Sequence, residues 1–303
     1  MAQTERSTSR RVSVVIASKV GEPFIGMCLD SVRAEVEQIS AEVVVVAHGK
    51  PAADLGRRYP WVRVVDSGGV RQVPAMRRIG VEVASGDLIA VIEEHCSAGK
   101  DWLHVALVAL DGSDYAAVGG PVVDHDYDRL RDWVVYFLEY NGSMPPAPDC
   151  ETPDLNDANI VYRRDVLMRH VALLDEGYWP MHLHPALVAE GARMRSVPGM
   201  LVHHRGPFDY GYYLGQRFLF SRAFAGVRAR SQSAWRRLAY LVAAPLIPVL
   251  LLARMALRVW QKRCRVGKFV LSTPLLVPAL VVFVAGEWLG ILLGPGDALS
   301  RVE

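Results

Sequence analysis

The sequence predicts a Rossmann-like α/β domain followed by two membrane helices. Short runs of β-branched residues alternate with helix-like stretches in the first third of the chain. One of these runs, Leu88–Ile92, ends in two carboxylates and an imidazole. The third observation is a strongly apolar region after Leu238, where two segments are long enough to cross a bilayer.

Strands and helices alternate in the order expected of parallel strands joined by right-handed crossovers. The predicted strands are Val12–Ala17, Glu42–Ala47, Val62–Val65 and Leu88–Ile92, and the predicted helices are Phe24–Ile39 and Pro74–Ala84. The continuous apolar run Leu88–Ile92 is typical of a strand buried on both faces of a mostly parallel sheet. The chain contains no GxGxxG fingerprint and no P-loop, which disfavours a dinucleotide enzyme or an NTPase.

Polar side chains follow the strand Leu88–Ile92 at its carboxyl end, where open α/β sheets bind ligands. These are Glu93, Glu94 and His95. Carboxylates suit hard cations such as Mg²⁺ or Mn²⁺, and Mn²⁺ also tolerates imidazole. Taken alone, the three residues would fit a solvated strand-to-loop junction equally well. In this context they form a candidate metal site.

Composition and charge narrow the functional classes. The 303 residues allow one large domain or two modest ones, and a net charge of +2 gives no argument for nucleic acid as a partner. The four cysteines are widely spaced and form no CxxC pair, so neither a disulfide framework nor a zinc site is expected. A reduced, cytosolic setting is the simplest inference. Met1–Arg11 lacks an apolar run, so no signal peptide is expected.

The membrane prediction rests on Leu238–Leu257 and Phe269–Gly294, each about the 20 residues that a span requires. Prolines interrupt both segments. Arg254 also interrupts the first segment and Glu287 the second, and basic residues cluster beside both segments. If both segments span, the basic clusters fall on opposite sides, against the positive-inside tendency. If both re-enter or lie in the interface, every basic residue stays cytoplasmic and faces anionic lipid. Both arrangements stay open, with the catalytic domain expected on the cytoplasmic face.

Several segments, in this order and spacing, resemble family-2 glycosyltransferases of the GT-A fold. They are Val12–Ser18, Glu42–Gly49, Pro74–Leu103, Val118–Val122, Asn159–Arg164, Val197–Pro198, Val202–His203, Gln216–Arg217 and Ser221–Arg222. The resemblance covers nearly the whole chain, and the apolar C-terminal pair recurs in membrane-bound members. It implies a mixed-sheet GT-A domain over residues 11–235 and a membrane-associated helical region over residues 236–303.

The resemblance also implies where a nucleotide-sugar donor would bind. The nucleotide-binding positions map to Ala17, Ser18, Glu22, His48 and Arg77. Arg77 takes the place of an arginine near the diphosphate, a role that suits a guanidinium, although an exposed helix arginine is an equal alternative. The acid that usually reads uracil is missing, because Ala47 and His48 stand there. His48 would hydrogen-bond the base or be a solvated loop residue.

Glu93, Glu94 and His95 take the place of the family's DxD motif. The resemblance implies that Glu93 and His95 hold a divalent cation, Mn²⁺ or Mg²⁺, and that Glu94 contacts the donor. Such a cation neutralises the charge that develops on the departing nucleoside diphosphate. Trp102, after the loop, is expected to be structural.

The resemblance further implies a general base and an acceptor side. The family supplies an Asp or Glu as the general base, and near residue 180 this chain has another residue in that place. His182 is the candidate base, because an imidazole titrates near physiological pH. Asp175, Glu176 or no base at all are the alternatives. Asn159 matches a position lining the acceptor side, and Gly119–Gly120 would let the backbone approach the sugar.

Taken together, the chain is expected to transfer a sugar, with inversion, from a nucleotide-sugar to a membrane-associated or cell-envelope acceptor. Arg217, Arg222 and Arg228 would meet lipid phosphates or an acceptor's diphosphate, or form a basic membrane-facing surface. The alternative is a degenerate, non-catalytic GT-A protein that binds a nucleotide-sugar or a partner at the membrane. A membrane-attached nucleotidyltransferase is less favoured, because no glycine-rich phosphate signature occurs near residue 20.

Overall fold

The computed structural model describes residues 11–174, 177–206, 209–230 and 232–302, and divides the chain into two compact units. The first unit combines the chain up to Val123 with Ala147–His204, and the second combines Asp124–Pro146 with Arg205–Glu303. The predicted α/β class is confirmed. The functional boundary after residue 235 stays a prediction, since compactness does not define where a membrane begins.

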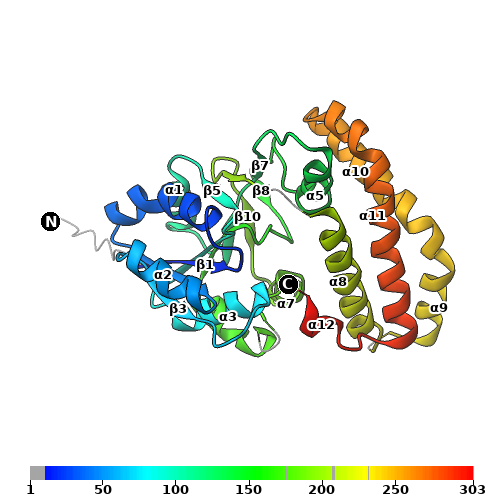
Figure 1. Cartoon of the computed structure of the whole chain (residues 1–303), viewed down its shortest axis with the longest axis horizontal. Helices are drawn as coiled ribbons and strands as arrows, with labels where there is room; N and C mark the ends of the chain where they lie inside the picture. The colour runs from blue at the N-terminus through cyan, green and yellow to red at the C-terminus, as the bar shows by residue number, and fades with distance from the viewer. Residues whose placement is uncertain (1–10, 175–176, 207–208, 231, 303) are drawn as a thin grey trace. The chain divides into compact units, whose positions relative to one another are not determined.

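The main sheet of the first unit has the strand order β3-β2-β1-β4-β9-β6-β10-β8 (Figure 1). The strands are β1 Val12–Ser18, β2 Glu42–Ala47, β3 Arg63–Asp66, β4 Leu88–Ile92, β6 Ala117–Gly119, β8 Cys150–Glu151, β9 Asn159–Arg163 and β10 Met194–Ser196. Strands β3, β2, β1 and β4 run parallel, whereas β9 runs antiparallel between β4 and β6. The sheet is therefore mixed, as the resemblance implies.

A second, three-stranded sheet has the order β5-β11-β7, formed by Cys96–Ala98, Val202–His204 and Val122–Asp124. Strands β5 and β11 pair antiparallel, with His204 opposite Cys96. This pairing brings the end of β11 next to the residues that follow β4, although more than a hundred positions separate them in sequence.

The helices of the first unit are α1 Phe24–Gln38, α2 Lys50–Arg58, α3 Val73–Val83, α4 Trp102–Leu110, α6 Arg164–Arg169 and α7 Pro180–Ala189, with a 3-10 turn η1 Val171–Leu174. The predicted helices correspond to α1 and α3. Helix α2 was not predicted, yet the parallel strands β2 and β3 cannot be joined without a crossover. Its buried residues Ala52 and Leu55 are three positions apart, which is a weak periodic signal in so short a segment.

The core of the first unit forms around β1 and β4. Every residue of β4 is at most 1% exposed, which confirms the prediction of a strand covered on both faces. On one face, Val15 and Ile89 belong to a buried cluster that includes Leu183 of α7. Helix α3 packs closely against the same face. A side chain at position 80 would overlap Val15, and Gly80 permits the close approach because it has none.

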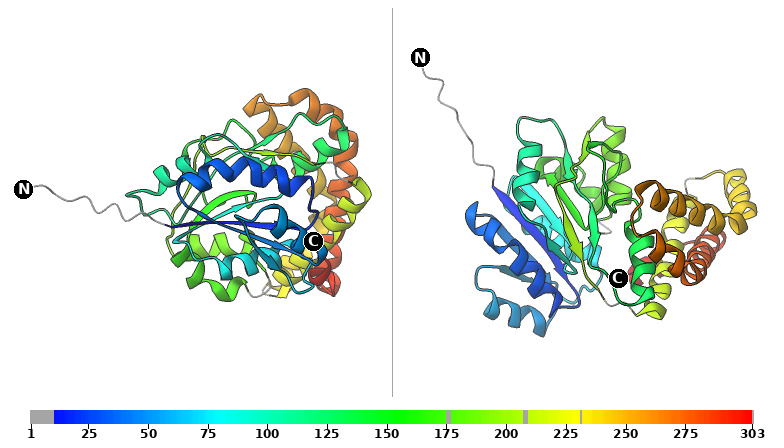
Figure 2. Two further views of the ribbon diagram at one scale, coloured as in Figure 1. Left: turned by 60° about the vertical axis from the view of Figure 1, so that its left-hand side comes forward. Right: turned by 90° about the horizontal axis from the view of Figure 1, so that it is seen from above.

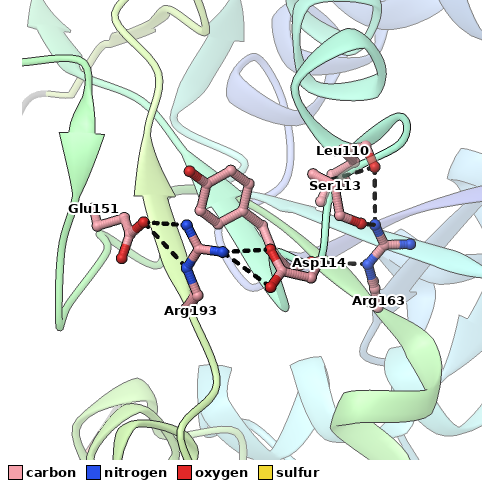
Figure 3. Close-up of polar contacts among 7 residues, drawn as sticks. Leu110, Ser113, Asp114, Glu151, Arg163 and Arg193 are labelled. Carbon is pink, nitrogen blue, oxygen red and sulfur yellow. Dashed lines mark hydrogen bonds and ion pairs between the residues drawn. The ribbon is translucent and has the colours of Figure 1, made fainter.

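Arg163, the last residue of β9, and Arg193, just before β10, hold neighbouring segments against the main sheet (Figure 3). Arg163 donates hydrogen bonds of 2.8 Å to the backbone carbonyls of Leu110 and Ser113, which satisfies carbonyls at the end of α4. Arg193 pairs with Asp114 at 2.7 Å and also with Glu151. The Arg193 pairs are solvent-exposed and contribute little stability, whereas the Arg163 contacts fix the loop before β6.

The second unit is helical. Its helices are α5 Leu130–Tyr140, α8 Tyr210–Arg230, α9 Ala234–Ala243, α10 Ile247–Lys262, α11 Val266–Leu293 and α12 Ala298–Arg301, with a 3-10 turn η2 Ala244–Leu246. The C-terminal helices, yellow to red, pack side by side in both views of Figure 2. Ala234–Lys262 and Val266–Leu293 are long and apolar enough to cross a membrane. The predicted segment Leu238–Leu257 lies within the first stretch, and the predicted segment Phe269–Gly294 lies within the second except for its last residue.

Candidate active site

The ends of four strands meet at one edge of the main sheet. Because β1, β2 and β4 are parallel neighbours, Ser18, His48 and Glu93 emerge from their carboxyl ends. Strand β9 starts at this edge, since Asn159 pairs with Ile92. Ligands bind at this edge in open α/β sheets. The structure therefore gathers most of the predicted site residues where the sequence analysis expects them.

Glu94 holds the loop that follows β1. Its side chain is 4% exposed, and its carboxylate accepts hydrogen bonds from the backbone N–H groups of Lys19, Val20 and Gly21 at 2.8–3.0 Å. The Ser18 hydroxyl donates a fourth hydrogen bond at 2.9 Å. Both carboxylate oxygens are thus used within the protein. Glu94 therefore shapes the predicted nucleotide loop, and its contact with a donor stays a prediction.

Replacing Glu94 by alanine is expected to lower the free energy of unfolding by about 2 kcal/mol, because three backbone donors lose their charged acceptor. The measurement is urea unfolding of the detergent-solubilised chain, followed by tryptophan fluorescence. Glu82→Ala is the matched control, since Glu82 on α3 is 39% exposed and makes only a helix-surface pair with Arg78. Equal unfolding midpoints for the two variants would contradict the role of Glu94.

Arg77 lies between two carboxylates. Its guanidinium is 3% exposed; it donates to Glu93 at 3.1 Å and also pairs with Asp157. Burial alone lowers the pKa of Arg77, but the negative charges of Asp157 and Glu93 outweigh burial and raise the pKa above its usual value. Arg77 is therefore a fixed cation at the strand edge, not the exposed helix arginine that was the alternative.

His95 and His204 place two imidazoles beside the same edge. The His95 ring stacks against Phe24, with ring centroids 4.6 Å apart, and lies 6.2 Å from the ring of His204. His204 is 1% exposed. One carboxylate and two imidazoles suit Mn²⁺ better than Mg²⁺. Glu93, His95 and His204 are thus the residues whose chemistry fits the expected cation.

In this structure, however, the three side chains do not form a ready-made site. Within the described residues, no group of three or more His, Cys, Asp or Glu side chains is close enough to hold a metal ion. The ion pair between Glu93 and Arg77 is one physical reason, because it directs the carboxylate toward the guanidinium. Binding a cation would require Glu93 to share its carboxylate with that cation.

The predicted nucleotide positions differ in exposure. Ala17 and Ser18 are buried at the end of β1, at 5% and 4% exposure. Glu22 is exposed, accepts a hydrogen bond from Tyr59 at 3.2 Å and pairs with Arg58 at 2.8 Å. His48 is partly exposed, and its Nδ1 is a buried atom without a hydrogen-bond partner among the described residues. An unpaired buried nitrogen is costly, and a bound base would supply the missing partner.

The candidate base His182 lies near the start of α7. His182 is partly exposed in the first turn of this helix. Asp175 and Glu176 lie outside the described residues. Two residues further along α7, His184 is buried and hydrogen-bonds Asp154 and Tyr162, each at 2.6 Å. Tyr178 donates a hydrogen bond to Tyr162 at 2.8 Å. These contacts fix the start of α7 and therefore the position of His182.

Asn159 and the glycine pair have structural roles that the resemblance did not imply. Asn159 is fully buried; it accepts a hydrogen bond from the Trp102 indole at 2.8 Å and donates to the carbonyls of Pro121 and Met200. A side chain at Gly120 would overlap the Met200 carbonyl. Asn159 and Gly120 therefore lock two loops to β9, and a role on the acceptor or sugar side stays a prediction. Trp102 is structural, as expected.

Two buried cysteines lie close to the site but do not suit nucleophilic chemistry. Burial, reinforced by the negative charge of Glu94, raises the pKa of Cys28, and burial with the charge of Glu93 does the same for Cys96. Both thiols stay protonated at physiological pH. All four cysteines are free in this structure.

The sequence analysis missed Asp157 and His204. Asp157 precedes β9 within Asn156–Asn159, and only the antiparallel pairing of β9 with β4 brings it to Arg77. His204 follows His203 in a short strand, and only its pairing with β5 brings it close to His95. In the sequence, only the acidic side chain of Asp157 and the imidazole of His204 indicate a possible role in the site. Their sequence spacing does not indicate that they lie close to Arg77 and His95.

Known proteins with similar sequences are sugar transferases. The sequence profile of glycosyl transferase family 2 matches residues 13–171. Human polypeptide N-acetylgalactosaminyltransferase 10 is 27% identical over 121 residues, which cover 36% of this chain and 19% of that protein. The chain therefore spans about a fifth of the length of this relative.

Solved structures show the same architecture. The mannosyltransferase PcManGT from Pyrobaculum calidifontis, in complex with GDP-Man and Mn²⁺, superposes with a TM-score of 0.58 at 15% identity, over 95% of this chain and 88% of that chain. GalNAc-T7 with UDP, GalNAc and Mn²⁺ superposes with a TM-score of 0.50 at 14% identity, over 66% and 44% of the two chains. These similarities confirm the GT-A fold. Because the family profile also matches more than half of the sequence, the chain belongs to glycosyl transferase family 2.

Proposed function

We propose that this protein transfers a sugar from a nucleotide-sugar donor to an acceptor held at a membrane or in the cell envelope. The observation that carries the proposal is the strand edge of the first unit, where Glu93, Arg77 and His95 gather beside the loop after β1. Membership of glycosyl transferase family 2 supports the reaction class. The sugar, the nucleotide and the acceptor are left open.

The donor would lie along the loop that Glu94 holds. Ala17, Ser18 and Glu22 would border the nucleotide, and His48 would offer its unpaired Nδ1 side to the base. Arg77 would counter the charge of the diphosphate while keeping its contacts to Asp157 and Glu93. The solved relatives bound to Mn²⁺ together with GDP-Man or UDP support a nucleotide-sugar donor and a divalent cation.

Glu93 and His95, joined by His204, would hold the cation. A divalent cation bound there supplies charge neutralisation for the departing nucleoside diphosphate. Arg77 limits how strongly Glu93 attracts the cation, because both compete for one carboxylate. We therefore expect weak, readily exchanged metal binding, tighter for Mn²⁺ than for Mg²⁺ because of the imidazoles.

The transfer would be a single displacement with inversion. The acceptor hydroxyl attacks the anomeric carbon as the bond from that carbon to the diphosphate breaks, and His182 takes the hydroxyl proton. Glu176 is the alternative base. His184 would act only through position, because Asp154 and Tyr162 occupy both of its ring nitrogens.

The apolar helices of the second unit support attachment to a membrane. We propose in addition that the catalytic unit lies on the cytoplasmic face. In this proposal residues 11–235 carry the transfer and residues 236–303 the attachment. An acceptor in or on the membrane would then be delivered to the enzyme along the surface to which it is already bound.

The test is to incubate the purified full-length chain, in detergent, with a panel of nucleotide-sugars that includes GDP-mannose and UDP-N-acetylgalactosamine. Slow release of a nucleoside diphosphate that requires Mn²⁺ and stops with EDTA is the expected result. Donor binding without release would favour the degenerate binding protein. Pyrophosphate release from a sugar phosphate and a nucleoside triphosphate would favour the nucleotidyltransferase. No binding of any donor would refute all three.

A further inference from the structure

We propose that the long helical hairpin of the second unit lies in one leaflet of an anionic membrane, so that both ends of the hairpin stay on one side. The hairpin is α9–α10 and α11, with its turn at Arg263–Arg265. This inference rests on the proposed membrane attachment and decides between the two arrangements that the sequence leaves open, spanning and lying in the interface.

Helix α8 runs beside α11 and in the same direction (Figure 1). Gly286 of α11 meets Phe218 of α8, and Gly290 meets Arg222. One turn further along, Gly226 of α8 meets Gly294. The contacting positions rise together in steps of four, so the two helices are parallel neighbours. Small residues at these contacts let the backbones approach closely.

The turn of the hairpin is fastened to the segment 124–146. Lys262 donates to the backbone carbonyls of Met144 and Pro146, and Arg265 pairs with Asp124 at 2.8 Å. Asp124 and Pro146 are bonded directly to Val123 and Ala147, which belong to the polar first unit. The turn is therefore on the side of the membrane that holds the first unit.

A spanning hairpin would place the start of α9 on the opposite side. The chain leaves the first unit at His204 and reaches Ala234 through α8. Helix α8 would then have to cross the bilayer as well, because it is the only helix in the described residues between these two points. At about 1.5 Å per residue, its 21 residues would just reach across.

The composition of α8 makes such a crossing unfavourable. Although α8 is long enough, only Ala234–Lys262 and Val266–Leu293 qualify as spans within the described residues. Helix α8 carries four arginines at positions 217, 222, 228 and 230. An arginine near the centre of a span strongly disfavours insertion into the bilayer. Arg217 and Arg228 are paired with Glu139 and Glu287, which reduces this cost without removing the charges from the helix.

The outward face of α9–α10 fits the surface of a membrane instead. Large apolar side chains recur on this face every three or four residues and are each 51–75% exposed. They are Trp235, Leu238, Val242, Leu246, Val249, Leu250, Leu257 and Trp260. The opposite face holds the buried residues Met255 and Val259. This is the pattern of a helix lying in the interface plane.

Basic residues beside the apolar stripe select the lipid. Arg236 and Arg254 are exposed, and each lies about 100° around the helix from the centre of the stripe, at its edge. Arg263, also exposed, follows in the turn. Each arginine near an anionic surface adds to the attraction between the helix and the lipid headgroups. We therefore assign the partner as a lipid surface rich in anionic headgroups.

Cysteine labelling in sealed membrane vesicles tests the arrangement. One variant keeps Cys264 in the turn and carries Cys150→Ser; the other carries Ser233→Cys at the start of α9 with Cys150→Ser and Cys264→Ser. Cys28 and Cys96 stay in both variants because they are buried. A membrane-impermeant maleimide is applied to right-side-out and to inverted vesicles. We expect positions 264 and 233 to react in the same vesicle orientation, which is also the one where Cys150 reacts in a Cys264→Ser variant.

Reaction of positions 264 and 233 from opposite sides would overturn the one-leaflet arrangement and leave the proposed membrane attachment and sugar transfer intact. Recovery of the whole chain in the soluble fraction without detergent would overturn both the arrangement and the attachment. Transferase activity is measured on the same samples, so that its loss is distinguished from a change in topology.

Vesicle flotation tests the charge argument. Binding to vesicles of phosphatidylcholine with 30% phosphatidylglycerol is expected to be at least tenfold tighter than to phosphatidylcholine alone. The double variant Arg236→Gln/Arg254→Gln is expected to lose about tenfold of this preference, and Arg57→Gln in the first unit, 77% exposed, is the control. Equal binding to both vesicle types would refute the anionic assignment.

Discussion

Replacing Glu93 by alanine is expected to lower kcat/KM for sugar transfer about 10²- to 10³-fold. The expected loss corresponds to about 3–4 kcal/mol of transition-state stabilisation, a size typical of losing a ligand that holds a catalytic cation. The variant should also need at least tenfold more Mn²⁺ for half-maximal nucleoside diphosphate release. The measurement is a Mn²⁺ titration of donor hydrolysis with wild type and variant side by side.

The controls separate loss of the metal site from loss of structure. Glu82→Ala removes an exposed carboxylate from the nearby helix α3 and should leave both kcat/KM and the Mn²⁺ dependence unchanged. His204→Gln should shift the Mn²⁺ dependence in the same direction as Glu93→Ala, because it removes another of the three donors. Unchanged metal dependence in Glu93→Ala would show that the cation is held elsewhere or is not used.

The strands of the first unit could be predicted closely because their sequences leave few alternatives. Val12–Ala17, Glu42–Ala47 and Leu88–Ile92 are runs of mostly β-branched residues, and β1, β2 and β4 match them to within one residue. Helix α2 was missed because its nine residues carry few apolar positions and follow the glycine at position 49. Helix α2 forms because the parallel strands β2 and β3 need a crossover connection between them.

The opposite roles of Glu93 and Glu94 could not be separated from the sequence. Successive side chains at the end of a strand point in different directions, so one carboxylate turns to Arg77 and the other to the loop after β1. Which carboxylate takes which direction depends on the register of β4 against β1. His204 and Asp157 were not predicted as site residues, because strand pairing rather than sequence spacing brings them to the site.

Arg77 links the stability of the site to its chemistry. The site holds negative charge on Glu93 and Asp157 before any diphosphate arrives, and the buried guanidinium keeps these carboxylates together. A cation and a diphosphate entering the site bring charges of both signs. Arg77 can then donate some of its hydrogen bonds to phosphate oxygens instead of the two carboxylates, so that its guanidinium stays paired. The residue is therefore expected to matter in the absence of donor as well as in its presence.

Replacing Arg77 by methionine is expected to lower the free energy of unfolding by about 3 kcal/mol. Methionine keeps most of the side-chain volume but leaves Glu93 and Asp157 facing each other without a cation, and breaking a buried pair in this way is strongly destabilising. The partial exposure of the two carboxylates, 26% and 36%, keeps the effect at the lower end of the usual range. Urea unfolding of the donor-free chain, followed by tryptophan fluorescence, measures it.

The neighbouring residue supplies a matched control. Arg78 is 31% exposed and pairs with Glu82 one turn along the same helix, so Arg78→Met should change the free energy of unfolding by less than about 0.5 kcal/mol. The double variant Arg77→Met/Asp157→Asn should recover part of the loss, because it removes one of the two facing charges. Equal stability of Arg77→Met and Arg78→Met would mean that Arg77 does not hold the two carboxylates together. Its proposed role would then be limited to contacting the donor.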